Sequence, residues 1–309
     1  MLPSARRRRP VLLIVGCGDV GLRVLRLLSG RWRVLALVRG AERVADLRAA
    51  GAVPLVGDLD APATLQRLAG LADRVLHLAP PPGEGGTDPR TRALLQALAR
   101  RPGGLRRLVY ASTTGVYGDC GGAWIDETRA LAPATARGRR RADAEARVRW
   151  AGRAFGWRCS LLRIPGIYAL DRAGGDPRER VRRGAPVLAA ADDVFTNHIH
   201  ADDLARACVA ALMRGAPQRA YHVNDDSQLS MGDHFDAVAD ACGLPRPPRL
   251  TRAEALATLS PMQMSFLSES RRLHNGRLTR ELRVRLRYPS VVQALRGADQ
   301  VPSGCFSTL

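Results

Sequence analysis

A glycine-rich turn follows an apolar strand near the amino end of the chain. Residues 11–15 are valine, leucine or isoleucine, and residues 16–21 read G-C-G-D-V-G before helical spacing of apolar residues begins. Glycine allows a tight turn at Gly16, close approach of a diphosphate to the backbone at Gly18, and close packing of a helix on the strand at Gly21. The helix that follows points free N–H groups at the phosphates. The pattern predicts a dinucleotide site, and the alternative is a glycine-rich turn in an unrelated α/β domain.

Strands and helices alternate over the first half of the chain. The sequence predicts further strands at residues 33–38, 53–56, 74–79, 107–112 and 159–164, with helices at 44–50, 63–71, 90–100 and 142–155. This alternation, with right-handed crossovers, is typical of an α/β protein with a Rossmann-type doubly wound parallel sheet.

The regularity ends after Pro165. Residues 169–186 are rich in glycine, arginine and aspartate, and after them Asp202 or Asp203 is placed to cap a helix at 204–213. Short strands, such as 221–224, then mix with helices at 231–242 and 252–259, and 283–288 is a candidate last strand. We therefore predict a dinucleotide-binding domain at 1–164, to which 194–215 returns, and a smaller α+β substrate lid at 165–193 and 216–309.

Composition excludes several classes of protein. All 48 basic residues among the 309 are arginine, and the net charge is +19. The arginines are dispersed without interleaved aromatic residues, a pattern that argues against nucleic acid as a partner. No apolar stretch reaches the roughly 18 residues of a membrane span, and the amino end lacks a signal segment, so we expect a cytoplasmic protein. The six cysteines are scattered, which predicts reduced thiols rather than disulfides.

The second strand bears on the choice of cofactor. It ends in Val38 and Arg39, and an arginine at this position favours NADP because a guanidinium can hold the 2′-phosphate. Glu42 is the alternative contact, to the ribose of NAD. Asp58, at the end of the third strand, is suited to accept a hydrogen bond from the adenine amino group, with Leu59 packed on the ring.

Several motifs together resemble those of the extended short-chain dehydrogenase/reductases, the NAD-dependent epimerase/dehydratase family. Besides the three glycines they are residues 58–59, 77–79, 112–119, 162–168 and 198–204. The resemblance covers most of the chain. It implies that Thr113 hydrogen-bonds the substrate oxygen and that the turn at 165–168 lines the nicotinamide.

The motif and the resemblance together predict a set of cofactor contacts. They are Gly16, Gly18, Asp19, Val20, Gly21, Arg39, Asp58, Leu59, Leu78, Ala79, Pro80, Pro165 and Ile167.

The resemblance fails at the family's catalytic pair, a Tyr-x-x-x-Lys. Counting back from Glu145, which matches a glutamate of the family, places Arg137 at the tyrosine position and Arg141 at the lysine position. Arg141 can still hold ribose hydroxyls, but Arg137 cannot act as acid or base because a guanidinium keeps its proton near neutral pH. The chain is therefore similar to an atypical member of the family.

Another group must then move the proton if the protein is catalytic. Tyr117 is the first candidate, and its alternative role is a ring packed under the cofactor. His200 is the second candidate, as a residue at the substrate. Its alternative role is a hydrogen-bonded structural pair with His198. The sequence offers no third ligand beside these two histidines, which argues against a metal site.

Arginines near the carboxyl end are candidates for an anionic substrate. Arg271 and Arg272 suit a group such as a sugar-nucleotide phosphate, and the alternative is a solvated helix face.

Three functions stay open at this stage. The first is an NAD(P)-dependent oxidoreductase or epimerase/dehydratase-like enzyme that moves hydride to or from a carbonyl or hydroxyl carbon of a small molecule. The second is a non-catalytic NAD(P) sensor, suggested by the absent tyrosine and lysine. The third is a basic nucleic-acid-associated protein. The family resemblance also suggests a homodimer.

Overall fold

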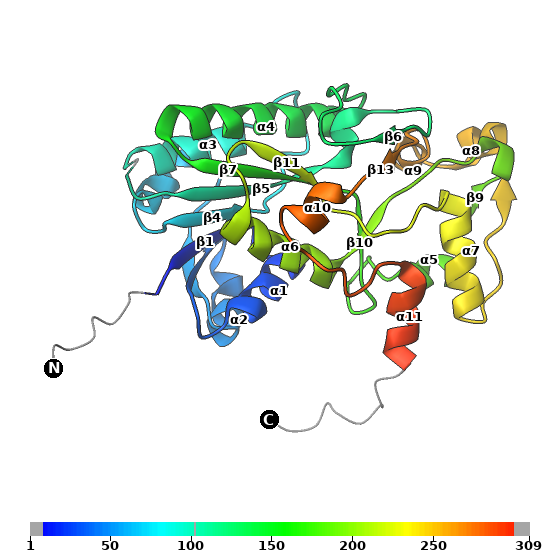
Figure 1. The fold of residues 1–309 in the computed structure, drawn as a ribbon, viewed down its shortest axis with the longest axis horizontal. Coiled ribbons are helices and arrows are strands. Elements are labelled where there is room, and N and C mark those ends of the chain that lie inside the picture. The colour runs from blue at the N-terminus through cyan, green and yellow to red at the C-terminus, as the bar shows by residue number, and fades with distance from the viewer. Residues whose placement is uncertain (1–8, 102, 300–309) are drawn as a thin grey trace.

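A parallel sheet forms the centre of the computed structural model, which describes residues 9–101 and 103–299 (Figure 1). Its strands are β1 (Val11–Val15), β2 (Arg33–Val38), β3 (Val53–Val56), β4 (Arg74–His77), β5 (Arg107–Thr113), β7 (Arg158–Ile164) and β11 (Arg219–His222). They lie in the order β11-β7-β5-β4-β1-β2-β3, and every pairing is parallel. The direction of winding reverses between β1 and β4, which opens a crevice at their carboxyl ends.

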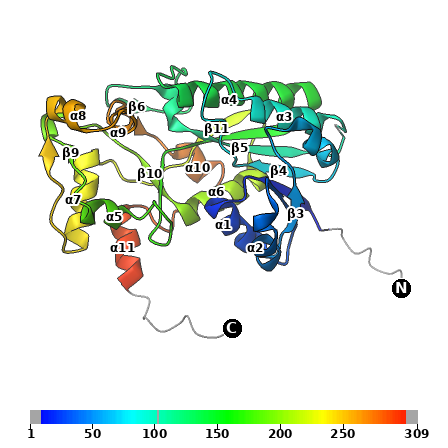
Figure 2. The same ribbon diagram turned by 180° about the vertical axis from the view of Figure 1, so that it is seen from behind.

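Helices cover both faces of this sheet, as Figures 1 and 2 show. On one face lie α1 (Asp19–Leu28), α2 (Val44–Ala49) and α6 (Ala201–Arg214), and on the other lie α3 (Pro89–Ala99) and α4 (Ala136–Phe155). Each face buries its own apolar cluster, one around Val24 and Leu204, the other around Leu94 and Val148. The predicted doubly wound α/β fold is confirmed.

A smaller unit packs beside the carboxyl ends of the strands. Its elements are β6 (Trp124–Ile125), β8 (Gly166–Tyr168), α5 (Pro177–Arg182), β9 (Val187–Leu188), β10 (His198–His200), α7 (Met231–Ala241), β12 (Arg249–Leu250), α8 (Arg252–Thr258), α9 (Pro261–Phe266), β13 (Arg272–Leu273) and α11 (Val291–Asp299). Helix α10 (Gly276–Arg280) packs on β11 of the central sheet, and its Leu278 belongs to the core of that sheet. Three short parallel pairs, β8–β10, β9–β12 and β6–β13, tie distant segments together. A separate core, which includes Val187, Phe235 and Leu267, stabilises this unit.

Some predicted boundaries are wrong. β11 is an edge strand of the central sheet, although the sequence placed residues 216–309 in the lid. Helix α4 begins at Ala136 rather than at 142, because the Thr135 hydroxyl accepts from Gly138 N at 3.0 Å and caps it. The segment predicted helical at 63–71 forms a 3₁₀ helix, Pro62–Leu68.

The predicted cap of α6 and the predicted last strand are also wrong. Asp203, one of the two predicted caps, instead binds the segment that was predicted to form the strand. His200 caps the helix, its Nδ1 accepting from Asp202 N at 3.2 Å. Asp203 is buried and accepts from the backbone N–H groups of Arg287 and Tyr288, at 2.9 and 2.8 Å to Oδ2. Residues 283–288 form no strand, and the two N–H groups at the end of this segment bind the Asp203 carboxylate instead. Within the described ranges, no helix is long and apolar enough to span a membrane.

Candidate functional site

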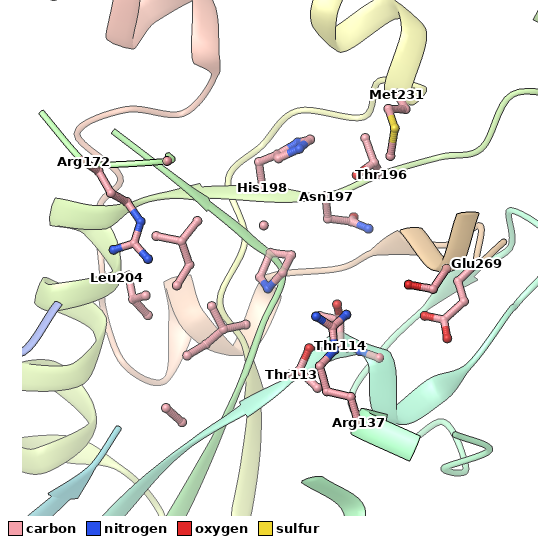
Figure 3. A pocket seen from close by; sticks show the side chains of 18 of the residues that line it. Thr113, Thr114, Arg137, Arg172, Thr196, Asn197, His198, Leu204, Met231 and Glu269 are labelled. Carbon is pink, nitrogen blue, oxygen red and sulfur yellow. Dashed lines mark hydrogen bonds between the residues drawn. The ribbon is translucent and has the colours of Figure 1, made fainter. Parts of the chain in front are cut away.

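A cleft of about 800 Å³ opens between the sheet and the smaller unit (Figure 3). Its walls come from the glycine turn before α1, the ends of β5 and β7, the segment around β10, and the segment after α9. The sequence-predicted residues on its surface are Gly16, Gly18, Asp19, Val20, Gly21, Leu78, Thr113, Arg141, Pro165, Ile167 and Arg271. The fold thus brings the glycine turn and Thr113, almost 100 residues apart in the sequence, into one continuous space.

The glycine turn has the geometry of a diphosphate cradle. Gly16 has φ +87°, and a β-carbon there would stand 2.5 Å from Ala79 N, so only glycine fits. A β-carbon on Gly21 would stand 3.1 Å from Cys17 Sγ in the turn and 3.4 Å from Ile14 Cγ2 on β1, which shows how closely α1 packs on the strand. A β-carbon on Gly18 would meet nothing within 4 Å. The backbone is therefore open to a ligand at Gly18 and closed at the other two positions.

The amino end of α1 faces this open side. Its N-cap, Gly18, has no side chain to occupy the first N–H groups, so these groups can donate to an anion. Asp19 stands in the first turn, but its carboxylate pairs with Arg23 at 3.1 Å and with Arg172. Arg172 also lines the cleft, so it adds positive charge beside the turn. These features fit a bound dinucleotide.

Arg23 fixes the loop that carries Arg172. It is buried, and its guanidinium contacts Asp171 and Asp202, each at 2.5 Å. Helix α1, the loop after β8 and the first turn of α6 are thereby joined. Sequence reasoning missed Arg172, since it lies in an irregular segment without a motif.

The residues predicted at the adenine end lie beside the cleft lining rather than on it. Arg39 is exposed at the end of β2, and Leu59 is buried. Asp58 is half-buried and its Oδ1 accepts from Asp60 N at 3.0 Å. Arg90, which pairs with Asp60 at 2.5 Å, donates to the carbonyl of Pro80 at 3.3 Å. Like Pro80, Ala79 lies outside the lining, with its backbone against Gly16.

The opposite end of the cleft holds Thr113 and the two arginines that replace the family pair. The Thr113 hydroxyl accepts from Gly115 N at 3.3 Å, at the end of β5. Arg141 donates to Ala111 O at 2.6 Å, which holds its guanidinium against β5. Helix α4 approaches so closely that a β-carbon on Gly138 would stand 2.6 Å from Gly115 O, and this places Arg137 at the cleft beside Thr113 (Figure 3).

Tyr117 does not lie where a catalytic role requires it. Only 2% of it is exposed, and its hydroxyl is held by Arg163 Nη1 and His222 Nε2, each at 2.6 Å. Burial raises the pKa of Tyr117 to about 12. The phenol lies outside the cleft lining, so the geometry contradicts its predicted role in proton transfer.

Two residues predicted at the substrate are also turned away from the cleft. His200 caps α6 and its ring packs on Tyr288, with the centroids 3.9 Å apart. Arg272 packs over the rings of Trp124 and Phe195 and donates to Gly122 O at 2.8 Å. These structural roles explain both residues, and neither is on the cleft surface.

Their neighbours in the sequence line the cleft instead. His198 does so, and its ring stacks on that of His234, with the centroids 3.8 Å apart. Among the described residues, this stack replaces the predicted hydrogen bond between His198 and His200. Arg271 lines the cleft as predicted and pairs with Glu269 at 2.8 Å. Glu269 was not predicted as a site residue, although it lies only two positions before Arg271. Over the described residues, no three His, Cys, Asp or Glu side chains are grouped to hold a metal ion.

Comparison with known proteins agrees with this geometry. The model of a family described as NAD(P)H-binding matches residues 16–214. No curated protein matches the chain. Among solved structures, a functionally unknown conserved protein from Silicibacter pomeroyi is 32% identical, with a TM-score of 0.79 over 94% of this chain and 99% of that one.

Two further solved structures show the same fold at lower identity. A UDP-glucose 4-epimerase from Thermotoga maritima is 18% identical, with a TM-score of 0.72 over 93% of this chain and 96% of that one. A dTDP-glucose 4,6-dehydratase from Streptomyces venezuelae is 20% identical, with a TM-score of 0.73 over 94% and 97%. The chain belongs to the NAD(P)H-binding family and has the Rossmann-type fold of the extended short-chain dehydrogenase/reductases, the group that includes the NAD-dependent epimerases and dehydratases.

Proposed function

We propose that the protein is a nicotinamide-dependent oxidoreductase or epimerase-like enzyme that acts on a hydroxyl or carbonyl carbon of a small molecule. The observation that carries the proposal is the single cleft joining the open side of Gly18 to the hydroxyl of Thr113. The bound nicotinamide would supply the hydride donor or acceptor. The protein supplies binding, orientation and a place for the proton.

The chain's own residues divide these tasks. The free N–H groups at the start of α1 bind the diphosphate, and Arg172 adds charge there. Pro165 and Ile167 provide an apolar surface for the nicotinamide ring. Thr113 orients the substrate oxygen, and Arg141 supplies positive charge beside it.

We further propose NADP as the preferred cofactor. Arg39 is exposed at the end of β2, and its charge helps to lower the pKa of Asp60, after the larger effect of the Arg90 hydrogen bond. Burial raises the pKa of Cys17, in the glycine turn, to about 11, and the positive charge of Arg43 opposes this rise. Arg43 therefore lies near the glycine turn. Two cations thus flank the position expected for a 2′-phosphate.

The substrate end favours an anionic molecule. Arg137, Arg180 and Arg271 line it, with Glu269 as the carboxylate among them, and Phe195 and Leu267 add apolar surface. The epimerase from Thermotoga maritima was solved with UDP-glucose. A sugar nucleotide is the class we propose to test first.

The decisive experiment is turnover of reduced nucleotide by the purified protein with a panel of sugar nucleotides, aldehydes and keto acids. We expect oxidation of the nucleotide, and Thr113→Val should lower kcat at least about tenfold while the affinity for nucleotide stays within about twofold. Thr258→Val, on the exposed helix α8, is the matched control. Tight nucleotide binding without turnover of any compound would favour a sensor over an enzyme.

Cofactor preference has its own test. Arg39→Asp should shift the ratio of NADPH to NADH affinity toward NADH by at least about tenfold, while Arg48→Asp, on the exposed side of α2, should leave it unchanged. An unchanged ratio in Arg39→Asp would remove this residue from the 2′-phosphate site.

A further inference from the structure

The cleft needs a group that exchanges a proton with the substrate, and few of its residues qualify. Arg137 and Arg141 keep their protons near neutral pH, and Tyr117 lies outside the cleft lining. Among the described residues that line the cleft, the aspartate, glutamate and histidine side chains are Asp19, His198 and Glu269, and the same lining includes no tyrosine, cysteine or lysine.

Two of these three are poorly placed for proton exchange at Thr113. Asp19 belongs to the first turn of α1 and pairs with Arg23 and Arg172 at the diphosphate end. The ring of His198 packs against Gly166 on one side and stacks on His234, at 3.8 Å between centroids. Burial lowers the pKa of His198 to about 4, so its ring stays neutral.

Glu269 has the required position. A β-carbon built on Gly115 would stand 3.7 Å from Thr113 Oγ1 and 3.9 Å from Glu269 Oε2, so both oxygens border one small space. Figure 3 shows Glu269 across this space from Arg137. The absence of a side chain at Gly115 leaves room for a substrate oxygen between them.

The carboxylate oxygen of Glu269 that borders this space is Oε2. Oε2 accepts from Arg271 Nη1 at 2.8 Å. Oε1 is buried and has no hydrogen-bond partner among the described residues, in a side chain that is only 10% exposed. A buried acceptor without a partner carries a desolvation cost. A carboxylate oxygen has two lone pairs, so Oε2 can accept from a substrate hydroxyl while it is bonded to Arg271.

The backbone around Glu269 is fixed to the loop that follows Thr113. Ser270 N donates to Asp119 Oδ1 at 2.7 Å, and Ser270 O accepts from the N–H groups of Cys120 and Gly122 at 3.0 Å each. Arg271 donates to Gly118 O at 2.7 Å. The carboxylate is therefore held in place before a substrate binds, as efficient proton transfer requires.

We propose that Glu269 is the catalytic residue that exchanges the substrate's proton, at the site where the family uses a tyrosine. This proposal depends on the proposed function. When a hydroxyl substrate is oxidised, its O–H bond breaks and the proton passes to Glu269 Oε2, the carboxylate oxygen that borders the space beside Thr113. The C–H electron pair leaves as hydride for the oxidised nicotinamide, and the C=O bond forms. Carbonyl reduction reverses each transfer.

Arg137 complements this role. Burial lowers the pKa of Arg137 and the negative charge of Glu269 opposes that change, so the two groups are electrostatically coupled across the cleft. An always-charged guanidinium stabilises the negative charge that develops on the substrate oxygen during proton transfer.

Turnover of the carbonyl panel by reduced nucleotide gives the first test. Glu269→Gln should lower kcat by about 10²- to 10⁴-fold, the usual contribution of general acid–base catalysis, with nucleotide affinity within about twofold of wild type. Glu269→Asp should restore part of the rate, and Glu84→Gln, at an exposed loop position, is the matched control. A kcat in Glu269→Gln within about threefold of wild type would contradict the proposal.

The second test needs no turnover. Isobutyramide mimics a carbonyl substrate but is not reduced, so its binding to protein loaded with reduced nucleotide is measured by calorimetry across pH. Binding to wild type should take up a proton and weaken as pH rises, whereas binding to Glu269→Gln should show neither effect.

The outcomes separate the two proposals. Equal pH dependence of isobutyramide binding in wild type and Glu269→Gln would overturn the role of Glu269. Failure of the reduced nucleotide itself to bind would instead overturn the proposed function.

Discussion

Replacement of Gly18 by valine separates stability from cofactor binding. Gly18 has φ −85° and ψ −152°, a conformation open to L-residues, and a β-carbon there meets nothing within 4 Å. The free energy of unfolding should therefore fall by about 1 kcal/mol or less, the usual effect of changing an N-cap glycine. The new side chain occupies the space in front of the first N–H groups of α1, where we place the diphosphate.

The expected loss of affinity follows from the bonds that the side chain blocks. A hydrogen bond from a backbone N–H to a charged phosphate contributes about 1.5–3 kcal/mol, and about 1.4 kcal/mol corresponds to a factor of ten. Losing one such bond should weaken nucleotide binding by about 10- to 150-fold. Calorimetry measures the dissociation constant, and urea unfolding measures stability. Unchanged affinity in a folded Gly18→Val protein would refute the placement of the diphosphate.

The remaining predictions concern stability. Gly16→Ala should lower the free energy of unfolding by at least about 1–2 kcal/mol, because the positive φ of Gly16 and its contact with the backbone after β4 both oppose a β-carbon. A smaller loss of stability than in Gly18→Val would contradict this. Glu145→Ala should lower the free energy of unfolding, measured in urea, by about 3–5 kcal/mol, because the buried guanidinium of Arg163 loses the carboxylate that lies 2.8 Å from it. A loss below about 1 kcal/mol would show that this ion pair does not stabilise the fold. Burial raises the pKa of Asp225 to about 7 from 3.8, so the folded protein holds an extra proton between these values and stability should fall as pH rises through that range. Asp225→Asn should remove this decline between about pH 5 and about pH 7, and the same decline in variant and wild type would assign it to another group.

The sequence predicted the central sheet well because local signals define it. Apolar runs mark buried parallel strands, and β1, β2 and β3 have the predicted bounds. The glycine turn was equally readable because its motif is local, although the contact that requires Gly16 comes from Ala79, after the neighbouring strand β4. The start of α4 was missed because residues 136–141, mostly arginine, show no apolar periodicity, although Thr135 provides a cap.

The candidate site was less predictable because its contacts are long-range. Tyr117 follows Thr113 closely in sequence, yet the 3₁₀ turn between them (Thr114–Tyr117) directs the phenol into the buried network of Arg163 and His222. Glu269 reaches the same turn from more than 150 residues away, and long-range contacts bring its segment there: the pairing of β6 with β13 and the hydrogen bonds of Ser270 and Arg271. Motifs locate a residue along the chain, whereas the direction of its side chain depends on the packing of distant segments.

The central claim is that the glycine turn and the first N–H groups of α1 bind the diphosphate of a nicotinamide dinucleotide. Calorimetric titration of the purified wild-type protein and of Gly18→Val with NADPH and NADH tests it most directly. We predict saturable binding by wild type, with NADPH bound more tightly than NADH, and markedly weaker binding of both by the variant. The absence of binding heat with either nucleotide in the folded wild-type protein would contradict the claim.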